Sequence, residues 1–475
     1  MMSVAPRETA IEIVRRLQTA GFAAFWVGGC VRDFLLGRKP QDYDIATDAR
    51  PEQIEKLFQR TLAVGRKFGV MIVVEGKQHC QVATFRAEAE YRDGRRPEKV
   101  VFSSAEADAQ RRDFTVNGLF YDPIAEKLHD WIGGEQDLRA KIIRTIGPPE
   151  ERFAEDHLRL LRAIRFAAQL GFEIEPQTFA AVKKLAPKIE LISAERIRDE
   201  LIKLFSPASC FVAAEVTRRT GMIPKHPPTH VGGYKSTVAA RGLVLLRDSR
   251  LLPGVLPELI ATLLCQQSPD YHPEGTVFEH IRLMLEKMPP NASPSLPWAV
   301  ILHDIAKPAT AERDPVSGAI HFYGHEKVGA AMAERILKRL RFPKKQIEEI
   351  VACVRQHMQF KDVKQMRKAT LRRLLLRQTF PLELELHRLD CLGSHGNLDH
   401  YDFLLAQAEE LKKKPAIRPP LLTGKDLIKL GMKPGPAMGV LLEEIREKQL
   451  ADELKTPREA GAWVKKQLKK RPGFV

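Results

Sequence analysis

The chain has 475 residues, which exceeds the size of an ordinary single core, so we expect at least three domains. Lys and Arg number 76 against 60 Asp and Glu, and the net charge of +16 fits a nucleic-acid partner and a solvated basic surface about equally well. The six cysteines form no CxxC pair, and no apolar stretch reaches the length of a membrane span. The composition favours a cytoplasmic protein with reduced thiols and argues against a membrane protein.

The first part of the chain alternates short helices and strands. Residues 7–18 have helical spacing, and the strand AFWV (24–27) runs through Gly28-Gly29 into a second helix over 31–36. The run QDYDIAT (41–47) predicts a strand, and GVMIVVEGKQHCQVATFR (69–86) predicts two strands joined at residues 75–77. This order predicts an α+β fold with a small mixed-sheet head.

From about Phe153 the apolar periodicity becomes helical and stays so. A stretch rich in Pro, Gly and His (221–242) and a linker at 411–420 interrupt it. We therefore expect a head and three mostly helical domains, over residues 1–147, 148–220, 250–412 and 420–475.

Asp42 and Asp44 stand two residues apart on the predicted strand, so both carboxylates project from one face and can bind one or two Mg²⁺ ions. Taken alone, a DxD pair is more often a turn or a solvated strand. Its surroundings favour a phosphate site, because Gly28-Gly29 at a strand-to-helix turn lets backbone N–H groups approach a triphosphate, and Arg32 adds a positive charge.

Five segments in order, GGCVRDFLLGRKPQDYDIAT, RRDFTVN, DWIGGEQDL, EDHLRLLRAIRF and AERIRDEL, resemble the class II tRNA nucleotidyltransferase and bacterial poly(A) polymerase family. The resemblance covers about the first 205 residues and implies that Asp42 and Asp44 hold catalytic Mg²⁺. It also implies a nucleotide site built by Gly28, Gly29, Arg32, Asp33, Arg111, Arg112, Asp113 and Asn117, of which Arg111 and Asp113 would contact the sugar.

Two further features follow from this resemblance. A hinge between head and neck is expected at Asp130, Gly133 and Asp137. Related polymerase folds often carry a third metal carboxylate on a neighbouring strand, but HCQVATF offers Gln81 there, so only two aspartates are predicted as ligands.

On the segment EDHLRLLRAIRF, Asp156 and Arg159 are three residues apart on one predicted helix, with Arg162 one turn further. One interpretation is an intrahelical ion pair. The other, which the resemblance implies, is a protein template for bases: the acid accepts from an exocyclic amine and the arginine donates to the adjacent ring nitrogen. Cytosine and adenine share that order of groups, so such a pair would accept CTP and ATP and reject UTP and GTP.

The same head occurs in enzymes with different products. The glycine after the phenylalanine in VGRKFGVMIV and the loop RAEAEYRDGRRPEKVVF favour CCA addition to tRNA over poly(A) synthesis, with A-only or CC-only addition as a further alternative. The segment LLTGKDLIKLGMKPGPAMGVLLEEI resembles the tail of CCA-type enzymes and either grips tRNA or forms a small packing domain.

The third block carries histidines at intervals, with an adjacent His-Asp pair after an apolar helical run, a pattern that fits divalent-metal ligation. It resembles the HD phosphohydrolase domain, which implies that one Mg²⁺, Mn²⁺, Ni²⁺ or Co²⁺ ion is held by His280, His303, Asp304 and Asp390, and that His325 and His357 can hold a second. A 2′,3′-cyclic or terminal phosphate on damaged tRNA is the expected substrate. The alternative is an inactive remnant.

Two other interpretations compete with an RNA nucleotidyltransferase that carries a phosphohydrolase. In one, the chain is an HD-type nucleotide hydrolase whose head binds nucleotide. In the other, it is a non-enzymatic RNA-binding scaffold. The intact Asp42 and Asp44 argue against both, and no oligomeric state is predicted.

Overall fold

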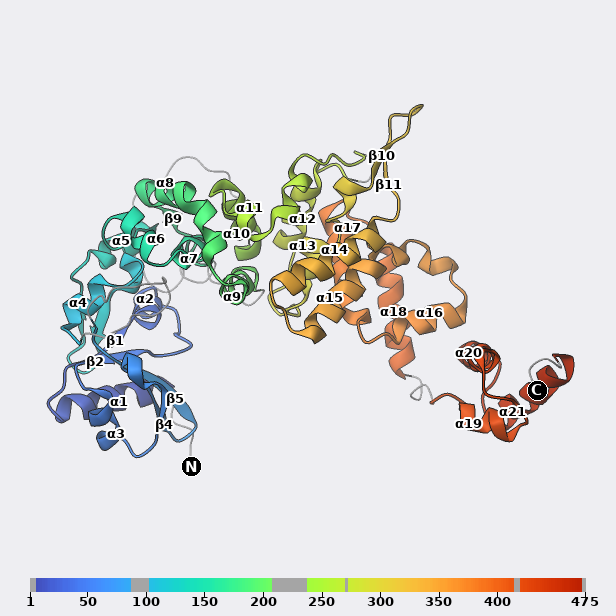
Figure 1. The fold of residues 1–475 in the computed structure, drawn as a ribbon, viewed down its shortest axis with the longest axis horizontal. Coiled ribbons are helices and arrows are strands. Elements are labelled where there is room, and N and C mark those ends of the chain that lie inside the picture. The colour runs from blue at the N-terminus through green and yellow to red at the C-terminus, as the bar shows by residue number, and fades with distance from the viewer. Residues whose placement is uncertain (1–5, 87–101, 207–236, 270–271, 414–418, 472–475) are drawn as a thin grey trace. The chain divides into compact units, whose positions relative to one another are not determined.

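A computed structural model describes residues 6–86, 102–206, 237–269, 272–413 and 419–471 (Figure 1). The chain forms two compact units. The first comprises Met1–Ile260, Met288–Pro294 and Arg339–Arg341, and the second comprises Ala261–Lys287, Ser295–Lys338 and Phe342–Val475. The predicted loop at 86–102 and the Pro-rich stretch at 221–242 lie largely outside the described residues.

The head is a seven-stranded sheet in the order β3-β4-β5-β2-β1-β6-β7, in which the β2–β5 pair is parallel and the other pairs are antiparallel. Its strands are β1 (Ala24–Val27), β2 (Ile45–Thr47), β3 (Thr61–Gly65), β4 (Val70–Glu75), β5 (Gln78–Thr84), β6 (Phe120–Asp122) and β7 (Lys127–His129). Its helices are α1 (Pro6–Thr19), α2 (Gly29–Leu35), α3 (Pro51–Leu57), α4 (Ala105–Gln110) and α5 (Gly134–Ala140). The predicted α+β class is confirmed.

Local sequence explains much of this sheet. Helix α1 buries Ile13, Val14 and Leu17 against β1, β2 and β5, as its helical spacing predicts. Strands β4 and β5 form the predicted hairpin, and Gly76 in its turn has the positive φ of +60° that glycine adopts without strain. The strand expected over residues 41–47 is shorter than predicted, because β2 begins at Ile45.

The neck is helical. Its elements are α6 (Pro149–Glu155), α7 (Leu158–Leu170), α8 (Pro176–Leu185), α9 (Ala194–Phe205), α10 (Val238–Asp248), α11 (Leu252–Val255) and the parallel pair β8 (Ile142–Ile143) and β9 (Glu173–Ile174). Helices α7, α9 and α10 pack on one another. Gly242 permits the close approach of α10 to α9, since a Cβ there would lie 2.5 Å from Leu204 Cδ1.

The expectation of one helix over residues 155–166 is wrong. The helix breaks at Asp156, whose backbone is extended (φ −149°, ψ 103°). The cause is local: Asp156 Oδ1 accepts a hydrogen bond from the backbone N–H of Leu158 at 3.0 Å. That bond satisfies one of the free N–H groups at the start of α7, so Asp156 ends one helix and caps the next.

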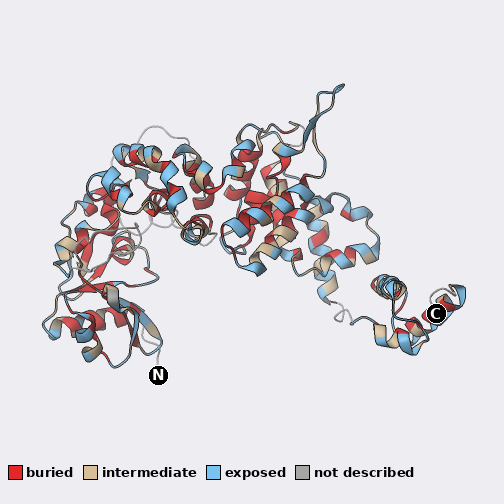
Figure 2. Ribbon diagram, viewed as in Figure 1, coloured by how far each residue is buried: buried red, intermediate tan, exposed pale blue. Residues whose placement is uncertain are grey.

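In the second unit, α12, α13, α15 and α17 pack together and turn their buried faces inward (Figure 2). The helices are α12 (Val277–Glu286), α13 (Leu296–Leu302), α14 (His325–Arg339), α15 (Lys344–Gln356), α16 (Lys368–Leu375), α17 (Phe380–Gly393) and α18 (Asp399–Lys413), with a hairpin of β10 (Ala311–Arg313) and β11 (Ile320–Phe322). Among the described helices, none is long and apolar enough to cross a membrane.

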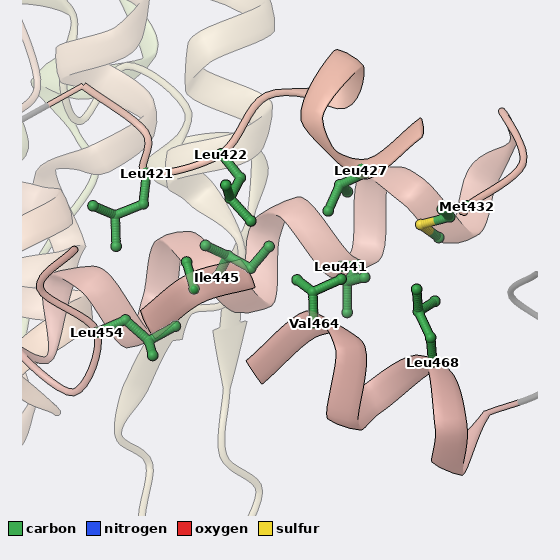
Figure 3. Close-up of a cluster of buried hydrophobic side chains, with 10 residues drawn as sticks. Leu421, Leu422, Leu427, Met432, Leu441, Ile445, Leu454, Val464 and Leu468 are labelled. Carbon is green, nitrogen blue, oxygen red and sulfur yellow. The ribbon is translucent and has the colours of Figure 1, made fainter. Parts of the chain in front are cut away.

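The last helices, α19 (Gly424–Lys429), α20 (Pro436–Leu450) and α21 (Pro457–Lys470), surround a small hydrophobic core. Leu427, Leu441, Ile445 and Val464 are buried in it (Figure 3). The tail is therefore a packed element, with Lys425, Lys429 and Lys433 exposed on its surface.

Candidate functional site

The two head aspartates lie in the extended segment that leads into β2, not on the strand itself. Asp42 and Asp44 are exposed, whereas Tyr43 and Ile45 between and after them are buried, so both carboxylates project to the same side. Partial desolvation raises the pKa of Asp44; the charge of Arg112 opposes this rise and the charge of Asp42 adds to it. A cation between the two carboxylates would relieve their repulsion, so these residues fit Mg²⁺.

The neighbouring strand offers a neutral side chain to this pair. Ile45 pairs with Val82 of β5, which places Gln81 at the level of Asp44. Gln81 is also exposed. The position where a third carboxylate was considered is therefore occupied by an amide.

The glycine turn before α2 brings backbone and arginine together. Gly28 has a φ of +74°, and a Cβ on it would lie 3.0 Å from Arg112 Nη1, so a larger residue would displace this guanidinium. Arg32 is buried and donates to Asn117 Oδ1 at 2.7 Å and to Asp33 Oδ1 at 2.9 Å. Three of the predicted nucleotide residues, Arg32, Asp33 and Asn117, are thus joined by hydrogen bonds.

Asp108 on α4 is a residue that the sequence analysis missed. Its Oδ1 accepts from Arg111 at 2.8 and 2.6 Å, and its Oδ2 accepts from Arg112 at 3.3 and 3.0 Å. Asp108 is buried, and although burial raises its pKa, the two arginines outweigh burial and lower it. Arg111 and Arg112 follow Asp108 by three and four residues, a helical spacing that could have indicated these ion pairs from the sequence.

Asp113 connects the head to the neck. Its Oδ2 accepts from Arg162 Nε and Nη2 of α7 at 2.8 and 2.6 Å, and its Oδ1 accepts from Asn117 Nδ2 at 3.2 Å. Arg162 also lies 3.7 Å from Glu200 of α9. The predicted nucleotide residues Arg32, Asn117, Asp113 and Arg162 therefore form one continuous chain of hydrogen bonds.

The predicted base-reading residues lie at the start of α7, but they do not pair with each other. Asp156 Oδ2 accepts from Arg196 Nη2 of α9 at 2.7 Å. Arg159 Nη1 donates to Glu155 Oε2 and to the carbonyl oxygen of Arg152 at 2.8 Å. The interpretation of Asp156 and Arg159 as an intrahelical ion pair is thus wrong. The partner of Asp156 is Arg196, 40 residues further along the chain, which sequence spacing alone could not reveal.

The predicted hinge is a tight turn before α5. Asp130 Oδ1 accepts from the N–H groups of Ile132 and Gly134 at 3.1 and 3.0 Å, and Gly133 has a φ of +75°. Asp137 Oδ2 accepts from Thr115 Oγ1 at 2.8 Å. A Cβ on Gly134 would lie 2.3 Å from the carbonyl oxygen of Thr115, so this glycine permits the packing of the turn.

The second unit brings all six predicted ligands of the third block into two groups that can hold metal ions. Within each group, the candidate ligand atoms lie within 4.8 Å of one another. The groups are His280, His303 and Asp390, and Asp304, His325 and His357. They come from α12, α17, the ends of α13 and α15 and the start of α14.

Hydrogen bonds orient three of these imidazoles. Nδ1 of His303, His325 and His357 lies 2.9, 2.7 and 2.7 Å from the carbonyl oxygens of residues 300, 322 and 354. A carbonyl can only accept, so Nδ1 carries the proton and Nε2 is left to bind metal. Nε2 of His325 and His357 lies 3.3 and 3.7 Å from Asp304 Oδ1.

The charges of this centre suit a cation. Burial raises the pKa of Asp304, but the charges of His303 and Lys307 hold that pKa well below its usual range. Nε2 of His280 and of His303 is buried without a well-directed hydrogen bond within the described residues. Ionised carboxylates beside free imidazole nitrogens are typical ligands of divalent transition metals.

Two contacts of this centre were not predicted. Lys307 Nζ lies 2.7 Å from Asp304 Oδ2 and donates to Gln267 Oε1 at 2.6 Å. Glu274 Oε1 lies 2.6 Å from His280 Nδ1. Lys307 follows the His-Asp pair by three residues, so its spacing could have indicated this contact from the sequence. Glu274 lies in a loop, where no periodic pattern indicates a contact.

Three stretches of the chain match known families. Residues 24–144 match the poly A polymerase head domain, residues 171–226 match the probable RNA and SrmB-binding site of polymerase A, and residues 272–392 match the HD domain. The chain therefore contains regions similar to the head and RNA-binding parts of poly A polymerases and to HD domains. The resemblance drawn from the five ordered segments is confirmed.

Two similar curated proteins are CCA-adding enzymes. That of Bacillus velezensis is 45% identical over 227 residues, 48% of this chain and 57% of the relative, and that of Staphylococcus aureus (strain MRSA252) is 46% identical over 198 residues, 42% and 49% of the two chains. The aligned segment thus spans about half the length of these curated relatives.

Solved structures of CCA-adding enzymes extend the likeness of fold over the whole chain. The Bacillus stearothermophilus CCA-adding enzyme in complex with CTP has a TM-score of 0.69 at 25% identity and is covered in full, as is this chain. The Thermotoga maritima enzyme complexed with tRNA has a TM-score of 0.56 at 18% identity, with 98% and 97% covered, and supports the fold alone.

Proposed function

We propose that this protein is a cytoplasmic tRNA nucleotidyltransferase that adds or repairs the 3′-terminal CCA of tRNA from CTP and ATP. The observation that carries the proposal is the exposed Asp42–Asp44 pair beside the Gly28 turn, with Arg112 over that turn. The CCA-adding enzymes among its relatives, one of them solved with CTP, support the same assignment.

The residues of the head and neck have separate roles in this reaction. The 3′ hydroxyl of the RNA attacks the α-phosphorus of the nucleotide, a new P–O bond forms, the hydroxyl loses its proton and pyrophosphate leaves. Mg²⁺ held by Asp42 and Asp44 would lower the pKa of the hydroxyl and neutralise developing charge. The turn at Gly28 and Gly29, with Arg112, would bind the triphosphate, and Asp108 would hold Arg112 in place.

Base selection is assigned to Asp156 and Arg159 at the start of α7. An ionised carboxylate has about four lone-pair sites, so Asp156 can keep its bonds to Arg196 and Leu158 and still accept from an exocyclic amine. Arg159 has five N–H donors, and its bonds to Glu155 and to the Arg152 carbonyl leave others for a ring nitrogen. Both groups are thereby held in one orientation before a nucleotide binds.

We further propose four domains: a nucleotidyltransferase head (1–147), a helical neck (148–220), an HD phosphohydrolase (250–412) and a tRNA-binding tail (420–475). In the HD domain, His280, His303, Asp304 and Asp390 would hold one divalent cation, and His325 and His357, which group with Asp304, would hold a second. A metal bound there would supply an activated water for hydrolysis of a cyclic or terminal phosphoester on a damaged tRNA end.

The competing products are a poly(A) tail and partial additions of A or CC. Gly69 favours the CCA type by resemblance, and the structure gives this glycine a local reason: its φ is +74°, and a Cβ would lie 3.1 Å from Phe102 Cε1. This geometry requires glycine but does not by itself choose the product.

The deciding experiment incubates the purified full chain with tRNA lacking CCA and all four nucleotides, followed by sequencing of the product. Three added nucleotides in the order C, C, A are expected, and the Asp42→Asn variant serves as the inactive control. A long A tail, a single A or CC alone would support the corresponding alternative. No addition by the wild type would refute the nucleotidyltransferase and leave the HD-type hydrolase as the remaining enzymatic function.

A further inference from the structure

Within the described residues, four imidazoles of the HD centre make a hydrogen bond through Nδ1. His280 differs from the other three in the kind of partner. His303, His325 and His357 use backbone carbonyls, whereas His280 uses the carboxylate of Glu274 at 2.6 Å. Glu274 Oε1 also lies 2.9 Å from Nδ1 of His272. The Glu274 side chain is only 6% exposed, so this contact is made away from bulk water.

The loop that carries Glu274 is closed by backbone hydrogen bonds. Gln267 N–H donates to the carbonyl of Gly275 at 3.1 Å, and Val277 N–H donates to that of Cys265 at 3.0 Å. Thr276 then caps α12, with its Oγ1 accepting from the N–H of residue 279 at 3.3 Å. The closed loop and the cap hold Glu274 beside the first turn of α12, where His280 lies.

We propose that Glu274 is a positioning residue of the HD metal centre: it fixes His280 with Nε2 toward the metal and strengthens that nitrogen as a ligand, while His272 holds the Glu274 carboxylate in place. This inference rests on the proposed metal-binding function of the HD domain. A carboxylate on the far nitrogen of a ligating histidine sets its tautomer and orientation and raises its basicity, and loss of such a partner typically costs 10- to 100-fold in metal affinity.

His280 Nε2 lies 3.0 Å from Asp390 Oδ1, inside the group with His303. With the proton held on Nδ1 by Glu274, Nε2 presents a lone pair to a cation that Asp390 and His303 would share. A backbone carbonyl on Nδ1 would fix the same tautomer but would carry no full negative charge. Glu274 therefore distinguishes His280 from the other three imidazoles in donor strength.

The test uses untagged, metal-free, full-length protein titrated with Co²⁺, with affinity measured by calorimetry and ligand geometry by the visible absorption of the bound ion. Glu274→Ala is expected to weaken Co²⁺ binding about 10- to 100-fold and to change the absorption bands. Glu274→Gln is expected to lose less, because its amide oxygen still accepts from His280. Glu312→Gln, an exposed glutamate of β10, is the matched control and should bind as the wild type does.

The possible failures are distinct. Wild-type affinity and spectrum in both Glu274 variants would overturn the role of Glu274 while leaving the metal centre intact. Equal Co²⁺ binding by the wild type and by His303→Ala would overturn the proposed metal centre itself. If Glu274→Ala does not fold, the Glu274→Gln variant decides the question, since it keeps the volume and the acceptor.

Discussion

Replacing Asp156 by asparagine is expected to reduce base selectivity while keeping the hydrogen bond to the start of α7. Oδ1 of Asp156 caps α7 through Leu158, and an asparagine oxygen can keep that bond. The position of Oδ2, which accepts from Arg196 at 2.7 Å, would then hold an NH₂ group. The oxygen that would accept a hydrogen bond from the exocyclic amine of cytosine or adenine is thus replaced by a donor.

The size of the effect follows from the charge of the lost acceptor. A hydrogen bond to a charged group contributes about 1.5–3 kcal/mol, and about 1.4 kcal/mol corresponds to a tenfold change. Discrimination of ATP against GTP, and of CTP against UTP, should therefore fall about ten- to a hundredfold. Asp156→Ala should lose selectivity as well, and it should also lose about 1 kcal/mol of stability with the cap.

The assay measures kcat/KM for each nucleotide alone on tRNA ending before the C or A to be added, with thermal unfolding in parallel. Asp199→Asn on α9 is the matched control, because its side chain is 55% exposed and pairs with its neighbour Arg198. An unchanged ratio of ATP to GTP in Asp156→Asn, with normal folding, would refute the template. A loss of stability without a change in selectivity would leave Asp156 with its capping role alone.

Three further predictions test the other groups. Asp42→Ala or Asp44→Ala should abolish nucleotide addition and leave tRNA affinity within about twofold of the wild-type value, since distributed phosphate contacts dominate binding. Near-normal incorporation by either variant with Mg²⁺ would contradict the head assignment. His303→Ala or Asp304→Asn should remove metal-dependent phosphoester hydrolysis and spare nucleotide addition. Chelation of the metal in the wild type should abolish the same hydrolysis. Hydrolysis that survives both the substitution and the chelation would count against the HD centre. Asp108→Asn should raise KM for CTP and ATP about tenfold or more, because two guanidinium groups lose a charged partner; an unchanged KM in steady-state kinetics would limit Asp108 to a role in folding.

Much of the head could be predicted from the sequence because its signals are local. The alternation of Asp42 and Asp44 with buried neighbours, the glycine turn at Gly28 and the hairpin at Gly76 depend on residues a few positions apart. Strand alternation and positive φ impose the same geometry in any fold. The family resemblance then supplied roles that spacing alone leaves open.

Only the tertiary structure decided which charges meet. Asp156 pairs with Arg196, Asp113 with Arg162 and His280 with Glu274. The first two partners lie 40 and 49 residues away along the chain, and the third lies on a loop without a repeat. Ion pairs and metal ligands act through space over a few ångströms, so helix packing and caps, rather than sequence spacing, determine which residues come within that reach.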